Sequence, residues 1–166
     1  MPFSIERNDL AFMEVDAVVI AANEFLKIGG GVGEAVARAA GIDEVQAACD
    51  ALAPCPTGHA VATPGFALPA RLIVHAVGPV WIDGDHGEEQ LLAQAYASAL
   101  ECAVEHDART IAMPLISAGS FGFDPALSFA IAREAVRDFL EEHEAYVRLV
   151  LWDKRAVEAR SEEAHV

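Results

Sequence analysis

Lysine is almost absent from this sequence, which contains only Lys27 and Lys154. Lysine and arginine together number 11 against 26 acidic residues, which gives a formal net charge of −15. Because sequence-independent binding of DNA or RNA relies on basic side chains at phosphates, this balance argues against nucleic acid as a partner. Salt screens repulsion between surface carboxylates, so the composition predicts a halophilic protein that gains stability from dilute buffer to molar KCl.

Long apolar runs are also missing. No stretch approaches the roughly 18 apolar residues that a bilayer crossing requires. The first residues, Met1–Ser4, lack the charged and apolar regions of a signal peptide. We therefore expect a soluble, cytoplasmic protein with no membrane partner.

Cysteine is scarce, and the three present, Cys49, Cys55 and Cys102, cannot all pair with one another. None has the spacing of a zinc site or of a Cys-x-x-Cys redox motif. The acidic loop Asp83–Glu89 raises calcium as an alternative, but its spacing matches no EF-hand. His75 lies in an apolar run and is interpreted as a core residue. The sequence thus predicts no metal and no cofactor.

Apolar residues are plentiful, at 54% of 166 residues, which is enough for one domain spanning 1–166. The strand-like runs are Phe3–Glu6, Asp16–Ala22, Gly58–Thr63, Arg71–Val77, Thr110–Ile116 and Tyr146–Trp152. Helical patterns lie between them, over Ile42–Leu52 and on three apolar faces: Val32, Ala35, Val36 and Ala39; Leu92, Ala95, Tyr96, Ala99, Cys102 and Ala103; Leu127, Ile131, Ala135 and Phe139. This alternation predicts an α/β fold, a three-layer α/β/α sandwich around a mixed, largely parallel sheet.

Two glycine-rich segments each come after a strand-like run and before a helical pattern. The first spans Asn23–Gly33, after Asp16–Ala22, and the second spans Ser117–Phe123, after Thr110–Ile116. Glycine lets main-chain N–H groups approach an anion without obstruction by Cβ, and a helix start leaves further N–H groups free. Two such loops at strand ends predict a diphosphate held from both sides.

The order and spacing of short motifs along nearly the whole chain resemble the macrodomain, the ADP-ribose-binding module. The matching segments are Asp16–Asn23 with its Ala-Ala-Asn ending, Gly29–Val32, Arg38–Gly41, Cys55–Gly58, Thr63–Gly65, Leu68–Ala70, Val74–Trp81 and Ser117–Phe123. The resemblance implies the same three-layer sandwich and ADP-ribose, free or attached to protein, as the ligand.

The resemblance also implies an adenine slot. Asp9 matches the family position whose carboxylate accepts a hydrogen bond from the adenine amino group, and Leu10 would add a main-chain contact. Guanine presents an acceptor there, so the carboxylate would discriminate against it. Trp152, at the end of the last strand, matches a position where relatives stack an aromatic ring on adenine. The alternatives are that Asp9 caps a turn and that Trp152 is a core residue.

At the other end of the ligand, Asn23 would hydrogen-bond the distal ribose through its amide, and it is the candidate catalytic residue. The alternative is that Asn23 only ends the strand in a turn. The other contacts that the resemblance implies come from Ala22, Gly30, Gly31, Val32 and Gly33 in the first loop and from Ser117, Gly119, Ser120, Phe121 and Gly122 in the second. Phe121 would pack over the distal ribose.

Two positions depart from the hydrolase branch of the family. Gly33 occupies the place of an aspartate thought to assist water attack, and Ile20 replaces the first asparagine of Asn-Ala-Ala-Asn. These departures favour a module that binds ADP-ribose or ADP-ribosylated protein, closer to the branch without the loop aspartate. The alternative is an ADP-ribosyl hydrolase or O-acetyl-ADP-ribose deacetylase. A third interpretation, a dehydrogenase domain, is weak because Glu34 occupies the last glycine position of the Rossmann fingerprint.

Overall fold

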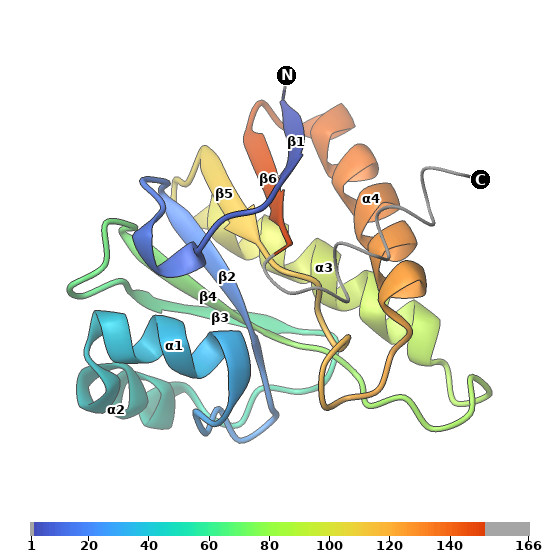
Figure 1. Cartoon of the computed structure of the whole chain (residues 1–166), viewed down its shortest axis with the longest axis horizontal. Coiled ribbons are helices and arrows are strands. Elements are labelled where there is room, and N and C mark those ends of the chain that lie inside the picture. Colours follow the sequence, from blue (N-terminus) through green and yellow to red (C-terminus); the bar gives the residue numbers. More distant parts are fainter. Residues whose placement is uncertain (1, 152–166) are drawn as a thin grey trace.

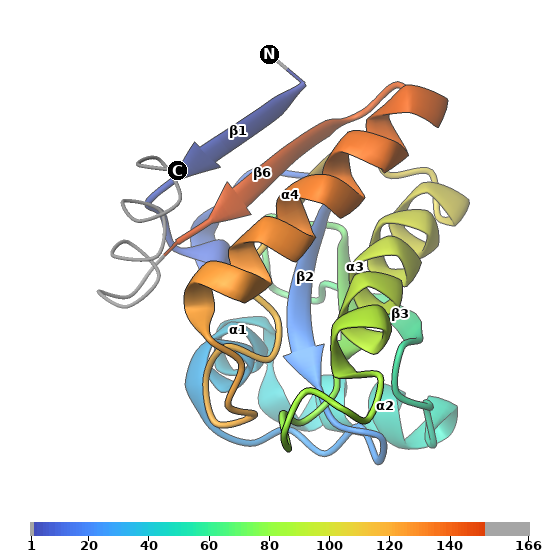
Figure 2. The same ribbon diagram turned by 90° about the vertical axis from the view of Figure 1, so that its right-hand side faces the viewer.

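The structure is a computed structural model and describes residues 2–151. These residues form a six-stranded sheet that lies between two layers of helices (Figures 1 and 2). In chain order the elements are β1 (Phe3–Glu6), the 3-10 helix η1 (Leu10–Phe12), β2 (Ala17–Ala22), α1 (Gly31–Ala40), α2 (Ile42–Leu52), β3 (Ala60–Pro64), β4 (Leu72–Val77), α3 (Glu88–Glu105), β5 (Thr110–Met113), α4 (Pro125–Glu142) and β6 (Tyr146–Val150). The predicted three-layer α/β/α sandwich is confirmed.

The strand order is β1-β6-β5-β2-β4-β3, and every neighbouring pair is parallel except β3 and β4. After β2 the chain crosses to β3 at one edge of the sheet, whereas after β5 it crosses to β6 on the other side. The loops that leave β2 and β5 therefore diverge from adjacent strands. In an open α/β sheet, such a switch point at the carboxyl ends of strands is where ligands bind.

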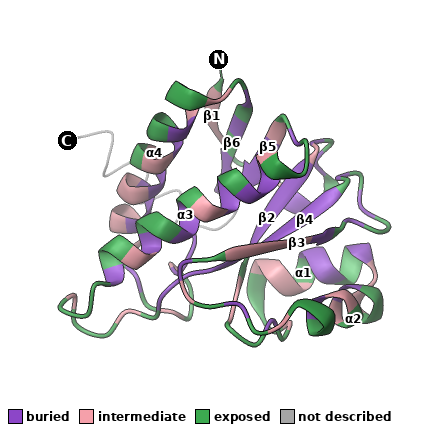
Figure 3. Cartoon of the chain, turned by 180° about the vertical axis from the view of Figure 1, so that it is seen from behind, coloured by how far each residue is buried: buried purple, intermediate pink, exposed green. Residues whose placement is uncertain are grey.

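Each face of the sheet has its own core. On β2, Ala17 and Val19 belong to the cluster with α3 and α4, whereas Val18 and Ile20 belong to the cluster with α1 and α2. This alternation follows from the two-residue period of a strand. Figure 3 shows β2 and β4 buried between the layers, but β2 becomes exposed at Ala21, where the strand approaches its end. The carboxyl end of β2 is thus open for a ligand.

The predicted helical faces are confirmed for α3, wrong in part for α1 and incomplete for α4, whose predicted residues all pack against the core. In α1 the buried residues are Val36, Ala37 and Ala40, while Ala35 and Ala39 are exposed. Alanine occupies both sides of this helix, so an apolar pattern could not select its buried face. In α4 the buried face contains Ser128, whose hydroxyl is hydrogen-bonded and which a hydrophobicity pattern cannot detect.

The fifth and sixth strands are shorter than predicted. β5 ends at Met113 because the next residue, Pro114, has no N–H to continue the hydrogen-bonded ladder. β6 ends at Val150, and Trp152 lies outside the described residues. Within the described part of the chain, no helix combines the length and apolar character that crossing a membrane demands.

Candidate functional site

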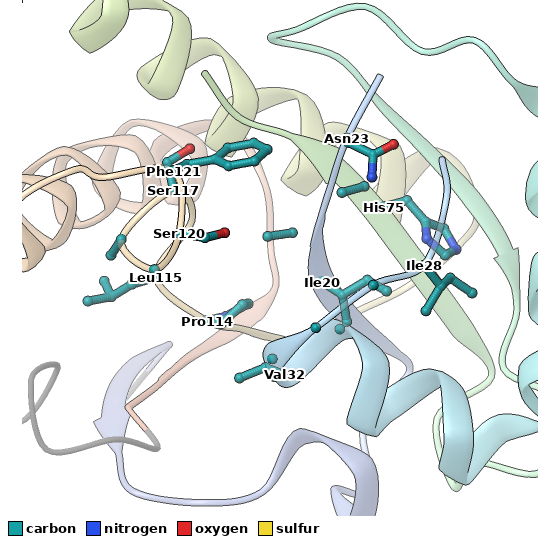
Figure 4. Close-up of a pocket in the computed structure, with 18 of the residues that line it drawn as sticks. Ile20, Asn23, Ile28, Val32, His75, Pro114, Leu115, Ser117, Ser120 and Phe121 are labelled. Atoms are coloured by element: carbon teal, nitrogen blue, oxygen red, sulfur yellow. The ribbon is translucent and has the colours of Figure 1, made fainter. Parts of the chain in front are cut away.

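A cavity of about 530 Å³ opens at the switch point, between the loop after β2 and the loop after β5. Figure 4 shows Asn23 and Ile28 on one side of it and Ser120 and Phe121 on the other. Its lining consists of Ile20–Asn23, Leu26–Gly33, His75, Pro114, Leu115, Ser117–Phe121, Pro125 and Val150. The two glycine-rich segments therefore form its opposite walls, as the sequence predicted.

The first wall ends in a helix start whose N–H groups are not capped by a side chain. Gly30 is the N-cap of α1, and no side chain of the described residues accepts a hydrogen bond there. Gly30 and Gly31 have φ of 66° and 65°, a left-handed conformation that costs glycine little, and a Cβ at either position would meet no atom within 4 Å. The first turn of α1 thus presents free N–H groups and the positive end of the helix dipole to the cavity.

The second wall presents a similar row of main-chain donors. Within residues 2–151, the N–H groups from Ala118 to Phe121 have no acceptor. Ser117 begins this stretch with φ of 64°, which is unusual for a residue with a side chain. Its hydroxyl is buried and has no hydrogen-bond partner among the described residues. Strain and unsatisfied polar groups in one short loop are typical of a binding site.

A ring of buried hydrogen bonds fixes the start of the second wall. The hydroxyl of Tyr96 in α3 accepts from the Ile116 N–H at 2.7 Å and donates to Ser128 Oγ in α4 at 2.7 Å. Ser128 in turn donates to the Ile116 carbonyl at 2.7 Å. Burial raises the pKa of Tyr96 well above its ordinary value, so the phenol stays protonated and able to donate. Further along the loop, the main-chain N–H of Trp81 donates to the Phe121 carbonyl at 2.7 Å.

The cavity lining differs in charge from the chain as a whole, which is strongly acidic. The net charge is −15, yet no aspartate or glutamate is among the described residues that line the cavity. The lining does include Lys27, whose Nζ lies 2.7 Å from Asp50 Oδ1. Two rows of free N–H groups without a competing carboxylate form a site suited to an anion.

Ten of the predicted site residues line this cavity: Ala22, Asn23, Gly30, Gly31, Val32, Gly33, Ser117, Gly119, Ser120 and Phe121. Gly122 does not line it. The Gly122 N–H donates to the Gly119 carbonyl at 3.1 Å, and its φ of 86° closes the turn of the loop. The structure therefore gives Gly122 a role in loop shape, and a contact with ligand stays a prediction.

The adenine-slot residues are not among the cavity lining. Asp9 caps η1, where its Oδ1 accepts from Ala11 N–H at 3.0 Å, and Leu10 is buried beneath this turn. Only Oδ1 of Asp9 has a partner within the described residues, so the other carboxylate oxygen is free to accept. The cavity reaches Val150, two residues before Trp152. The adenine contacts of these residues stay predictions.

Asn23 has a structural role that the sequence presented only as an alternative. Its Oδ1 accepts from Phe25 N–H and Lys27 N–H, both at 3.1 Å, and its Nδ2 donates to the Lys27 carbonyl at 2.8 Å. These contacts fold the loop back on itself. One amide hydrogen of Asn23 is left for a ligand hydroxyl, so the same side chain can shape the loop and contact a ribose.

Sequence reasoning missed much of the apolar lining, including Leu26, Ile28, Leu115 and Pro125. Each lies within or next to a glycine-rich segment, and this proximity was the available signal. Val150 had no local signal, because it reaches the cavity only through the pairing of β6 with β5.

His75 has the core position that the sequence predicted, although one part of it reaches the cavity wall. It is 1% exposed, and its Nε2 lies 2.9 Å from Thr63 Oγ1. Thr63 Oγ1 donates to the Pro64 carbonyl, so it accepts from a protonated Nε2, and Nδ1 faces the Cys49 thiol at 3.7 Å. Burial lowers the pKa of His75 from 6.5 to about 4, so the ring is neutral at pH 7.

This buried imidazole predicts a loss of stability in mild acid. An unfolded histidine binds a proton near pH 6.5, whereas His75 in the folded protein resists protonation until about pH 4. Stability is therefore lost as the pH falls between these values, by about 3 kcal/mol. Urea unfolding at pH 7.0, 5.5 and 4.5 measures this loss.

The matched variant is His75→Gln, which keeps a hydrogen-bonding group near Thr63 but cannot take up a proton. It should flatten the stability profile between pH 6.5 and 4.5. Asp16 and Glu88, whose pKa values are lowered in the fold, lose their contribution only at lower pH. An equal acid dependence in both proteins would contradict the role given to His75.

Two clusters of potential metal ligands occur among the described residues: Asp83, His86 and Glu88; and Glu101, Glu142 and His143. Neither lines the cavity. The Glu88 carboxylate accepts four main-chain N–H groups of its own loop. Burial alone would raise its pKa, but these four donors outweigh burial and lower the pKa to about 2. In the second cluster, His143 Nε2 pairs with Glu101 at 2.8 Å. Hydrogen bonds within the protein therefore involve two of the three residues of the second cluster and all three of the first.

Comparison with known proteins agrees with this geometry. The family model described as Macro domain matches residues 19–145. A macro domain-containing protein of Ralstonia nicotianae is 51% identical over 132 residues, which is 80% of this chain and 77% of the relative. A protein of Escherichia fergusonii named O-acetyl-ADP-ribose deacetylase is 45% identical over 141 residues, 82% of this chain and 79% of the relative.

Solved structures show the same fold with nucleotide ligands. The Oceanobacillus iheyensis macrodomain with ADP has a TM-score of 0.88 and 34% identity, covering 96% of this chain and 87% of that one. The Trypanosoma brucei macrodomain in complex with ADP-ribose has a TM-score of 0.84 and 29% identity, covering 96% of this chain and 68% of that one.

Proposed function

The chain belongs to the macrodomain family, and we propose that it binds ADP-ribose, free or attached to protein, through its two glycine-rich loops. The diphosphate would lie between the loops, the adenine toward Val150 and Asp9, and the distal ribose beside Asn23 and Phe121. Solved relatives with ADP and with ADP-ribose support this assignment of the ligand.

The observation that carries the proposal is the pair of facing N–H rows. The uncapped start of α1 and the free N–H groups of Ala118–Phe121 lie on opposite sides of one cavity whose described lining has no carboxylate. A diphosphate carries negative charge on both phosphoryl groups and needs donors from two sides. Because the donors are held by the fold, little ordering is needed when the ligand binds.

Thermal unfolding with three nucleotides tests the proposal. ADP-ribose at 100 times its Kd should add about 2.7 kcal/mol of stability, which for a chain of this size corresponds to roughly 5–10 °C in Tm. At equal concentration ADP should give a smaller shift, since it lacks the distal ribose. GDP should give the smallest, because Asp9 would face an acceptor on guanine. Equal shifts from all three nucleotides would refute the adenine and ribose positions.

Hydrolysis is the second candidate function, favoured by the likeness to a relative named O-acetyl-ADP-ribose deacetylase. As a hydrolase the chain would remove mono-ADP-ribose from proteins or deacetylate O-acetyl-ADP-ribose, with Asn23 orienting the distal ribose. Positioning of the substrate and electrostatic stabilisation of the transition state accelerate such a reaction even without a catalytic acid or base. Gly33 supplies no acid or base at the family position, so we propose slow turnover and a place in the branch without the loop aspartate.

We further propose that residues 1–166 are one macrodomain that acts in the cytoplasm without a metal or cofactor. Mono-ADP-ribosylated proteins are the proposed macromolecular partners, and the acid-rich composition disfavours nucleic acid.

Unfolding in a KCl series from dilute buffer to molar salt tests the proposed halophilic character. Stability should rise with salt, and a flat stability profile would contradict this proposal.

A further inference from the structure

The loop between β2 and α1 is held by a side chain that lies outside the cavity. Gln46, on α2, accepts from the Ile28 N–H at 3.0 Å through Oε1 and donates to the Leu26 carbonyl at 3.0 Å through Nε2. Nε2 also lies 2.9 Å from Asp50 Oδ1, which pairs with Lys27. One amide of α2 thus binds the loop backbone at two points, 18 and 20 residues away in the sequence.

Two side-chain amides, those of Asn23 and Gln46, hydrogen-bond to the main chain of this loop. The Asn23 amide satisfies Phe25 N–H and both main-chain groups of Lys27. Gln46 satisfies a further pair, Leu26 C=O and Ile28 N–H. Asn23 is part of the cavity wall, whereas Gln46 is not among its lining residues. Gln46 is therefore an anchor for the loop that does not itself face the ligand.

Within residues 2–151, no side chain hydrogen-bonds to the glycine run after Ile28, and the Gly30 carbonyl accepts only from the Glu34 N–H of α1 at 3.4 Å. Gly29, Gly30 and Gly31 are exposed, and a Cβ at any of them would meet no atom within 4 Å. Glycine loses more conformational freedom on ordering than any other residue. The place of this run is therefore set by its two ends, which are Ile28, held by Gln46, and the first turn of α1.

We propose that Gln46 is a positioning residue that pre-organises the first glycine loop for the distal ribose and the adjoining phosphate of ADP-ribose. The inference rests on the proposed function. Without the Gln46 amide, two loop groups lose their partners. On its amino-terminal side the glycine run is then held only through the Asn23 contacts to Lys27. The ligand must then order the loop itself, which lowers affinity without removing any direct contact.

The test compares two ligands in one variant. Gln46→Leu keeps the size of the side chain and removes both hydrogen bonds to the loop, together with the contact to Asp50. The Kd for ADP-ribose should rise roughly tenfold or more by calorimetry, the effect of ordering one or two additional residues. The Kd for AMP, which lacks the distal ribose and second phosphate, should change less than twofold. A variant that merely lost folded protein would lose both ligands in the same proportion.

A control substitution and a second measurement accompany the Gln46→Leu variant. Gln90→Leu makes the same substitution at an exposed position of α3 that does not line the cavity, and it should bind both ligands as the native chain does. Amide hydrogen exchange at Ile28 and Gly29–Gly31 should accelerate in Gln46→Leu. If that variant does not fold, Gln46→Asn, which withdraws the amide by one methylene, must show the same selective loss.

The outcomes separate the positioning role from the function on which it rests. Failure of the native chain to bind ADP-ribose would overturn the proposed function. If the native chain binds ADP-ribose, two results in the Gln46 variants would overturn the positioning role alone. One is an unchanged affinity for ADP-ribose, and the other is an equal loss of affinity for ADP-ribose and AMP. A selective loss of ADP-ribose affinity with faster exchange at the glycine run is the expected result.

Discussion

Replacing Gly119 with valine is expected to weaken ADP-ribose binding by about 100-fold while leaving the protein folded. Gly119 lies in the second wall, and a Cβ built on it would meet no protein atom within 4 Å. The Cβ of the new side chain therefore does not clash with the fold. A β-branched side chain would instead block the approach of the diphosphate to the N–H groups of Ala118–Phe121.

The size of this effect depends on the hydrogen bonds that are lost. A hydrogen bond to a charged group contributes about 1.5–3 kcal/mol, so losing one or two raises the Kd by about 100-fold. Calorimetry with ADP-ribose measures the loss, and Tm without ligand should stay within about 2 °C of the native value, as for a surface substitution. Gly119→Ala is the graded control, with a smaller loss. Near-native affinity of Gly119→Val would refute the second wall as the diphosphate site.

Introducing an aspartate at position 33 is expected to increase turnover of mono-ADP-ribosylated protein by about 10²- to 10⁴-fold, the usual contribution of one positioned acid or base. Gly33 lines the cavity and lies in the first turn of α1, where a carboxylate also interacts favourably with the helix dipole. The native chain should turn over slowly or undetectably while it binds ADP-ribose normally.

The structure shows that this substitution has a packing cost. A Cβ at Gly33 would lie 3.3 Å from the Ala21 carbonyl oxygen, so the start of α1 must shift by a few tenths of an ångström. Gly33→Ala measures this cost alone, and Gly33→Asn adds the shape of the side chain without the acid. Native turnover equal to that of Gly33→Asp would show that the acid is unnecessary, and hydrolysis would then displace binding as the principal function.

Asn23 serves the fold and the site at once. The Asn23 amide makes three hydrogen bonds to Phe25 and Lys27. Asn23→Ala would therefore loosen the loop as well as remove a ribose contact, and a loss of affinity there cannot be assigned to the ribose alone. The Gln46 variants disturb the loop from outside the cavity, so the two sets of variants together separate loop order from direct contact.

The sequence by itself determined the elements and the chemistry of the two loops. Buried strands of a parallel sheet are continuous apolar runs, and glycine-rich segments after them are local patterns, so both are visible along the chain. The three-layer sandwich and the facing walls of the cavity could be predicted from these patterns. The residue type at position 33 is also read directly from the sequence, which has glycine where the hydrolase branch has aspartate.

Only the tertiary structure decided how those loops are held. The anchors Gln46, Tyr96 and Ser128 act on backbone groups that are 12 to 20 residues away in the chain. A hydrogen bond between such groups depends on how the helices pack against the sheet, and the local periodicity of the sequence does not indicate it. The same reason explains the buried faces of α1 and α4, where alanine on both sides and a satisfied serine left the hydrophobic pattern undecided.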